Sequence, residues 1–194
     1  MSSSGFGFFA LIPCLLILGV VVFVALFLVV TYNRFVQLRQ RVKESWADID
    51  VELKRRYDLI PNLVATAQGY ATHEKELFET ITTERTQALA STGRAGDQAV
   101  DERPLVSHLG QLIGLAEAYP DLKADAQFMK LQEELAETED RLAAARRFYN
   151  GNVRELNTLR GSFPSKIVAD LMRIEGADLF EVDESLQRTP PQVP

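Results

Sequence analysis

An uninterrupted apolar run near the N-terminus constrains this sequence more than any other feature. No Lys, Arg, Asp or Glu precedes Arg34, and the stretch from Phe6 to Val30 carries no charge at all. As a helix rising about 1.5 Å per residue, this stretch would reach roughly 37 Å, which exceeds the ~30 Å hydrocarbon core of a bilayer. The sequence therefore predicts a transmembrane helix over residues 6–31, in contact with lipid.

A cleaved signal peptide is the alternative interpretation of the run. Such a peptide has a basic segment first, an apolar core of about 7–15 residues and a small-x-small cleavage site. Here no Lys or Arg comes first, the core is longer, and Leu28–Tyr32 at its end offers no small-x-small site. We therefore expect an uncleaved anchor, with Tyr32 and Arg34 at the membrane–water interface.

Basic residues beside the run predict which way the anchor points. None precedes it, whereas four follow it closely: Arg34, Arg39, Arg41 and Lys43. Because basic flanks stay on the cytoplasmic side, we expect the N-terminus outside and the body in the cytoplasm.

Composition excludes several other classes of protein. The formal net charge of −6 provides no basic surface for nucleic acid. Cys14 is the only cysteine, so a disulfide scaffold is excluded. Apolar residues recur throughout the body, which argues against intrinsic disorder.

Beyond the run, apolar residues recur every three or four positions, as on one face of a helix. The series comprises Phe35, Leu38, Val42, Trp46, Ile49, Leu53, Tyr57 and Ile60. No Gly or Pro lies between Gly19 and Pro61, so the membrane helix is predicted to continue into the body as far as Leu59. Pro61 is predicted to end this helix, with Asp58 as the N-cap of the next one.

The remaining patterns predict further helices. A second helix is expected as far as Leu89, a loop over 91–104, a short helix over 105–116, and a long helix from Asp121 to Gly161 with coiled-coil-like spacing. No segment alternates with period two, so no strand is expected. The fold class is all-α: a single N-terminal transmembrane helix continuous with an antiparallel up-and-down bundle of three long helices and one short helix. The domains are an anchor (6–31), a bundle (32–175) and a flexible acidic, Pro-rich tail (176–194).

Several segments of the body occur together in the order found in one known family. They are Leu53–Val64 (LKRRYDLIPNLV) with Gly69–Glu74, Glu117–Lys123 (EAYPDLK), Leu131–Glu139 (LQEELAETE), Ala145–Asn150 (ARRFYN) and Phe163-Pro164. In these motifs, and in its single N-terminal anchor, the sequence resembles the LemA family of membrane proteins.

The resemblance implies a bacterial membrane protein with an up-and-down helical bundle. It implies no catalytic mechanism, because no general activity is established for the family, and some relatives are linked to magnetosome assembly. We expect a non-enzymatic, single-pass protein of the bacterial inner membrane, whose bundle is an interaction or assembly scaffold for other proteins, including copies of itself. The alternative is a membrane-anchored sensor that binds a small ligand or peptide between its helices.

The sequence offers no assembled catalytic or metal motif. His73 and His108 belong to neither a Glu-x-x-His nor an H-E-x-x-H pattern, and no G-x-S-x-G occurs. The segment from Gly93 to Gly96 is neither a P-loop nor a dinucleotide fingerprint. We therefore expect no catalytic residue, no metal and no cofactor.

A set of polar residues close to the apolar faces forms the candidate network. It comprises Arg55, Arg56, Asp58, Asn62, Arg146, Asn150 and Asn157. One interpretation is a buried hydrogen-bonded network that fixes the register of the helices, and the other is a recognition surface for a peptide or subunit. The run Lys54–Arg56 is separately interpreted as a solvated face, and the acidic C-terminal end as a soluble tail or a docking segment for a basic partner.

Overall fold

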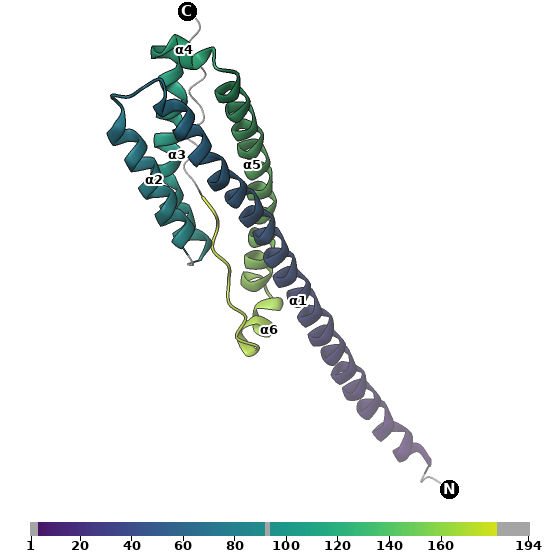
Figure 1. Cartoon of the computed structure of the whole chain (residues 1–194). Coiled ribbons are helices and arrows are strands. Elements are labelled where there is room, and N and C mark those ends of the chain that lie inside the picture. The colour runs from purple at the N-terminus through teal and green to yellow at the C-terminus, as the bar shows by residue number, and fades with distance from the viewer. Residues whose placement is uncertain (1–3, 92–93, 182–194) are drawn as a thin grey trace, which may run out of the picture. The chain divides into compact units, whose positions relative to one another are not determined.

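The computed structural model describes residues 4–91 and 94–181, with side chains from Pro13 onward. The described chain is helical, as Figure 1 shows, and contains no strand. This confirms the all-α prediction. The helices are α1 (Ser4–Gln68), α2 (Lys75–Ala90), α3 (Ala95–Ala118), α4 (Pro120–Lys123), α5 (Ala126–Gly161) and α6 (Ser165–Leu171).

Helix α1 is a single helix of 65 residues. The predicted continuity from the apolar run into the body is therefore confirmed, but the predicted break at Pro61 is wrong. Asp58 is not an N-cap; it lies inside α1 and is exposed. Pro61 is also exposed, so its ring lies on the solvent face, and the helix continues for two further turns to Gln68.

The predicted loop over 91–104 is also largely wrong, because α3 begins at Ala95 and carries Pro104 in its interior. Residues 92–93 lie outside the described residues. The first turns of α3 bury Ala95, Gln98, Ala99 and Glu102. This face has helical spacing, but it is made of small and polar residues, and a search for large apolar side chains misses it.

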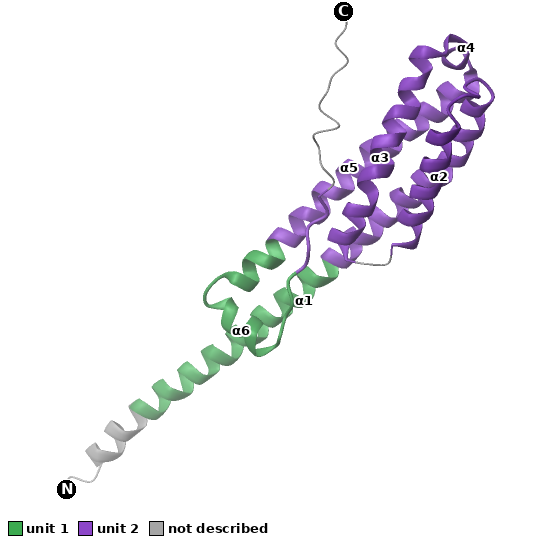
Figure 2. Cartoon of the chain, turned by 90° about the vertical axis from the view of Figure 1, so that its left-hand side faces the viewer, with its two compact units in different colours: residues 1–41, 155–176 green, residues 42–154, 177–194 purple. Residues whose placement is uncertain are grey.

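The chain divides into two compact units, coloured in Figure 2. Unit 1 comprises Met1–Arg41 and Glu155–Gly176, and unit 2 comprises Val42–Arg154 and Ala177–Pro194. Helices α1 and α5 each contribute residues to both units, whereas α6 belongs to unit 1.

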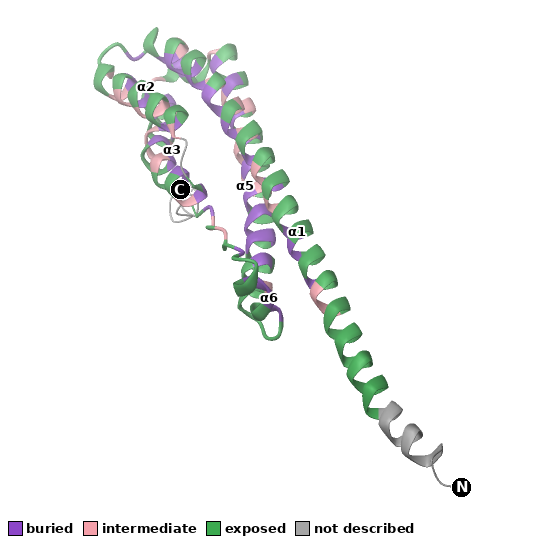
Figure 3. Cartoon of the chain, turned by 90° about the horizontal axis from the view of Figure 1, so that it is seen from below, coloured by how far each residue is buried: buried purple, intermediate pink, exposed green. Residues whose placement is uncertain are grey.

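In unit 1, residues 13–26 of the apolar run of α1 expose their side chains, as the green of Figure 3 shows. Phe23, for example, is 72% exposed. Among the helices whose side chains are described, only α1 is long and apolar enough to cross a membrane. The buried side chains of unit 1 begin at the end of this run, and they include Thr31, Phe35, Leu38, Leu156, Val168 and Ala169.

Unit 2 contains the main hydrophobic core. Its fully buried large side chains include Ile49, Ile60, Leu63, Phe78, Ile81, Leu105, Leu112, Phe128 and Phe180. Trp46, a member of the apolar series of α1, packs its ring against Tyr149 at 5.3 Å and Phe180 at 5.5 Å between centroids. The segment expected to be a tail from residue 176 therefore contributes Phe180 to the core, because its ring fills an aromatic cluster; residues 182–194 lie outside the described residues.

Candidate functional site

A buried ionic cluster joins three helices within unit 2. Arg56 of α1 is 1% exposed, and its guanidinium pairs with the carboxylates of Glu102 on α3 and Glu139 on α5. The Nη1 atom of Arg56 donates to Glu139 Oε1 over 3.0 Å. Three helices that are distant in sequence are thereby joined through one cation.

Two further side chains satisfy the Glu102 carboxylate. The hydroxyl of Tyr57 donates to Glu102 Oε1, and Gln98 Nε2 donates to the same oxygen over 3.0 Å. Gln98 Nε2 also lies 3.2 Å from the carbonyl oxygen of Ala88 in α2. We refer to Arg56, Tyr57, Gln98, Glu102 and Glu139 as the Arg56 cluster.

The electrostatics of the cluster favour its charged form. Burial disfavours the cation of Arg56, but Glu139 and Glu102 outweigh this penalty, so the pKa of Arg56 lies above its usual value. Burial, followed by the charge of Glu102, raises the pKa of the Tyr57 phenol, which keeps it a hydrogen-bond donor. The buried Nε atom of Arg56 has no hydrogen-bond partner among the described residues.

A second polar contact fixes the C-terminal segment onto α5. Asn150 Nδ2 donates to the Phe180 carbonyl over 3.0 Å, and the Phe180 N–H donates to Asn150 Oδ1 over 2.9 Å. One buried amide therefore satisfies both backbone groups of Phe180. Arg146, one turn away on α5, lines a cavity of about 10 Å³ together with Arg56 and Phe180.

The structure separates the seven candidate residues that the sequence suggested. Arg56, Arg146 and Asn150 are buried in unit 2, and Arg55 is half-buried. Asp58, Asn62 and Asn157 are exposed, and Asn157 belongs to unit 1.

The solvated-face interpretation of Lys54–Arg56 is therefore wrong for Arg56. Leu53, Arg56, Tyr57 and Ile60 share one buried face of α1 at helical spacing, and Arg56 falls on that face. Its acidic partners are Glu102 and Glu139 rather than Asp58, because residues two apart on a helix do not face each other. Sequence reasoning missed Glu102; its signal is the spacing of Ala95, Gln98, Glu102 and Leu105.

An open groove of about 490 Å³ lies between α3 and α5, also within unit 2. Its lining is mostly apolar and includes the buried side chains of Leu109 and Leu135. Glu139 lines the groove while it pairs with Arg56, so the groove and the Arg56 cluster share a residue. The full lining is Val106, Leu109, Gly110, Ile113, Gln132, Leu135, Ala136, Glu139, Asp140 and Ala143.

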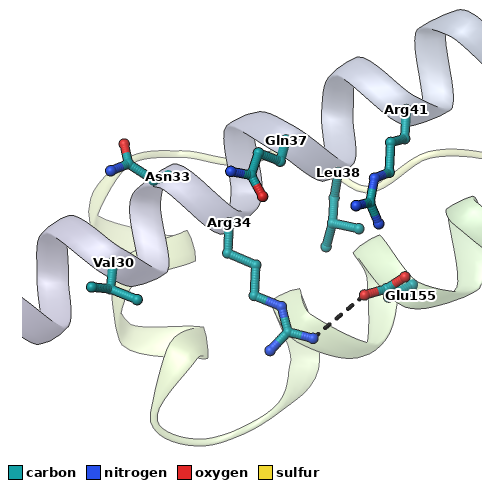
Figure 4. Close-up of a pocket in the computed structure, with 7 residues that line it drawn as sticks. All are labelled: Val30, Asn33, Arg34, Gln37, Leu38, Arg41 and Glu155. Atoms are coloured by element: carbon teal, nitrogen blue, oxygen red, sulfur yellow. Dashed lines mark hydrogen bonds and ion pairs between the residues drawn. The ribbon is translucent and has the colours of Figure 1, made fainter.

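Unit 1 has a pocket of different character, about 370 Å³ in volume, which begins at the last residue of the apolar run (Figure 4). Arg34 Nη2 lies 3.4 Å from Glu155 Oε1 across it, and both side chains are about half exposed. The remaining lining residues are Val30, Asn33, Gln37, Leu38 and Arg41. We call this the Arg34 pocket.

No group of three or more His, Cys, Asp or Glu side chains suitable for a metal occurs among the described residues. His108 Nδ1 lies 2.9 Å from Glu84 Oε2 and 3.1 Å from the Pro104 carbonyl oxygen, and the latter contact is local to α3. His73 is exposed.

Comparison with known proteins relates the chain to bacterial proteins. It is 24% identical over 190 residues to magnetosome protein MamQ 2 of Paramagnetospirillum magneticum, covering 85% of this chain and 70% of that protein. It is 21% identical to magnetosome protein MamQ of Magnetospirillum gryphiswaldense, covering 84% and 69%. It is 24% identical over 178 residues to protein LemA of Metamycoplasma hominis, covering 91% and 80%.

These relatives and the apolar segment of α1 together indicate a membrane-associated helical protein. The LemA family profile matches residues 45–194, which include the Arg56 cluster and the groove. The chain therefore belongs to the LemA family.

Proposed function

We propose that this chain is a single-pass, membrane-anchored scaffold whose groove between α3 and α5 receives an amphipathic helix of another protein or of a second copy of the chain. The observation that carries this proposal is the groove itself: it is open, mostly apolar and about 490 Å³ in volume. Relatives named as magnetosome proteins agree with a membrane-associated role.

The chemistry of the groove suits a helix with one apolar face. The groove is lined by three small residues, Gly110 on α3 and Ala136 and Ala143 on α5. Small residues allow the backbone of a partner helix to pack closely against the groove. Glu139 and Asp140 contribute carboxylates to the lining. The favoured partner is therefore an amphipathic segment that carries Lys or Arg beside its apolar face.

The Arg56 cluster gives the groove a fixed shape. Arg56 pairs with Glu139 on one wall of the groove and with Glu102, which precedes the groove residues on α3. Displacing one partner of a buried ion pair costs free energy, because it leaves the other charge buried without its counter-charge. The pairing therefore keeps α3 and α5 in one register. Binding to a preformed groove then avoids the entropic cost of ordering it.

In-membrane photocrosslinking tests the docking proposal. A photoreactive amino acid is placed at Gly110 in the full chain, with Gly114 on the same helix as the matched control. An added Cβ meets nothing within 4 Å at either glycine, but only Gly110 lines the groove. We expect Gly110 to give a defined crosslink to a protein carrying a basic amphipathic segment, or to a tagged second copy, and Gly114 to give none. Equal crosslinking from both positions contradicts the proposal.

A sensor is the second candidate function, and the volume of the groove favours it. About 490 Å³ falls within the range of roughly 300–1,000 Å³ that is typical of small-ligand sites. A thermal-shift screen of the full chain in detergent tests this candidate. A compound that stabilises the wild type and the Gly114→Trp variant, but not the Gly110→Trp variant, supports it; stabilisation that survives Gly110→Trp places the ligand elsewhere.

We also propose that the N-terminus lies outside the inner membrane and the bundle in the cytoplasm. The support is the absence of basic residues before the apolar run and the presence of Arg34, Arg39 and Arg41 after it. A cysteine at Pro194 in a Cys14→Ala background should resist a membrane-impermeant thiol reagent in intact cells and react after permeabilisation. Labelling in intact cells would reverse the orientation.

A further inference from the structure

Unit 1 exposes a cluster of large apolar side chains where α5 turns into α6. Phe163 is 83% exposed, Leu171 67%, Ile167 57% and Met172 48%. We call these four residues the apolar corner. The opposite face of α6 buries Ser165, Val168 and Ala169, so this short helix has apolar residues on both faces. An exposed apolar cluster of this kind marks a contact surface.

The contact between Arg34 and Glu155 shows which part of α1 lies at the same height as the apolar corner. Figures 1 and 2 show the last turns of α5 beside α1, running in the opposite direction, with the short α6 following them. From Glu155, α5 continues six residues to its end at Gly161, which corresponds to about 9 Å along a helix. The same displacement back along α1 from Arg34 reaches Leu28, within the apolar run.

Burial along α1 agrees with this level. Phe27 and Leu28 are half-buried, whereas the preceding Leu26 and the following Val29 are exposed. Thr31 and Phe35, one and two turns further on, are buried. The apolar corner is therefore level with the last turns of the apolar run, where a membrane helix leaves the hydrocarbon.

Basic side chains around the corner suit the phosphates of a phospholipid surface. Lys166 and Arg173 flank its apolar residues and are exposed, as are the acidic Asp170 and Glu175. Arg34 follows Val30 by four residues, or about 6 Å, which places its pocket within the headgroup layer of a bilayer whose hydrocarbon core ends at Val30. Asn33 and Gln37 add amide donors to that pocket.

We propose that the apolar corner inserts into the membrane interface as a second lipid contact beside the transmembrane helix, with the Arg34 pocket facing the phosphates of anionic headgroups. This inference rests on the proposed membrane anchoring and extends it. A single transmembrane helix leaves unit 1 free to rotate about the axis of α1. Two separated membrane contacts restrain this rotation.

The test uses the full chain in vesicles of phosphatidylcholine and phosphatidylglycerol that contain doxyl-labelled lipid. An environment-sensitive fluorophore is attached to a single cysteine: native Cys14, Phe163→Cys or Leu171→Cys, the last two in a Cys14→Ala background. Met129→Cys is the matched control, because Met129 is a large apolar residue that is 52% exposed and lies near the other end of α5. We expect a blue shift and loss of emission at Cys14, Phe163→Cys and Leu171→Cys, and neither change at Met129→Cys.

The label at Cys14 distinguishes two kinds of failure. Quenching at Cys14 without quenching at Phe163→Cys and Leu171→Cys overturns this inference and leaves the anchor in place. If none of the labelled sites is quenched, both the proposed membrane anchor and this inference are overturned. Disulfide-linked dimers of the unlabelled Phe163→Cys variant after mild oxidation, without lipid quenching of the labelled variant, also overturn the inference, because a second copy of the chain then covers the corner.

Discussion

Arg85 donates its Nε–H to the carbonyl oxygen of Tyr57 over 2.6 Å. This carbonyl is the one that Pro61 leaves without its usual donor, because a proline has no N–H to give to the residue four positions before it. A side chain from α2 thus replaces a backbone hydrogen bond of α1. The replacement explains how α1 passes through Pro61 without ending.

The Arg85→Met substitution should destabilise unit 2 because it leaves the buried Tyr57 carbonyl without a donor. A hydrogen bond to a charged donor contributes about 1.5–3 kcal/mol, and we expect a loss of that order. Thermal unfolding of the full chain in detergent, followed by circular dichroism, measures it.

Pro61→Ala provides the control for this effect. Alanine restores the N–H at position 61, so Arg85→Met should cost less in the Pro61→Ala background than in the wild type. Equal costs in the two backgrounds would show that Arg85 does not compensate for the proline.

Removing Glu102, one of the two acidic partners of Arg56, should lower the stability of unit 2 more than Arg85→Met does. Glu102→Ala leaves Arg56 buried with one carboxylate fewer and removes the acceptor of Tyr57 and Gln98. Breaking a buried ion pair on one side typically costs about 3–5 kcal/mol. Asp101→Ala, at the neighbouring position of α3, should change the melting temperature far less, and comparable losses in the two variants would argue against the cluster.

Asn150→Ala should release the segment around Phe180. The substitution removes both the donor and the acceptor that hold the Phe180 backbone. We expect faster amide hydrogen exchange over residues 177–181 and a loss of about 1–3 kcal/mol, the typical cost of unsatisfied buried groups. Asn150→Asp keeps the acceptor alone and should be intermediate; unchanged exchange in both variants would contradict the contact.

Tyr149 should contribute a pH dependence on the alkaline side. Burial, followed by the charge of Asp178, raises the pKa of Tyr149 to about 12, while its hydroxyl donates to the Asp178 carbonyl over 2.9 Å. Because the folded pKa lies above the unfolded value of about 10, this stability is complete below pH ~10 and is lost as the pH rises towards 12. Tyr149→Phe should therefore lose less stability than the wild type over this window, and its phenolate absorbance titration should lack the late step. If the stability of Tyr149→Phe falls in parallel with that of the wild type over this window, the raised pKa of Tyr149 is refuted.

Particular residues show how far sequence reasoning reached into the fold. The spacing from Phe35 to Ile60 predicted the continuation of α1, because the apolar period of a helix is visible without knowledge of its neighbours. Pro61 and Pro104 misled the prediction, since a proline's effect depends on what its surroundings provide. At Pro61 the compensating group comes from Arg85, 24 positions away in the sequence.

The candidate site shows the same limit. Arg56, Arg146 and Asn150 could be selected because they share helical faces with apolar residues. Glu102 and Phe180 were missed, since one lies on a helical face that begins with small and polar residues and the other in a segment rich in acidic residues. Their roles arise from pairing across helices.

The sequence by itself determined the helical class, the apolar segment and the continuity of α1, because hydrophobic periodicity and the length of an uncharged run are local properties. Only the tertiary structure decided which charges are paired, which proline is compensated, and where the groove and the apolar corner lie. Those features depend on side chains from separate helices meeting in space, and no spacing within a single helix encodes that meeting.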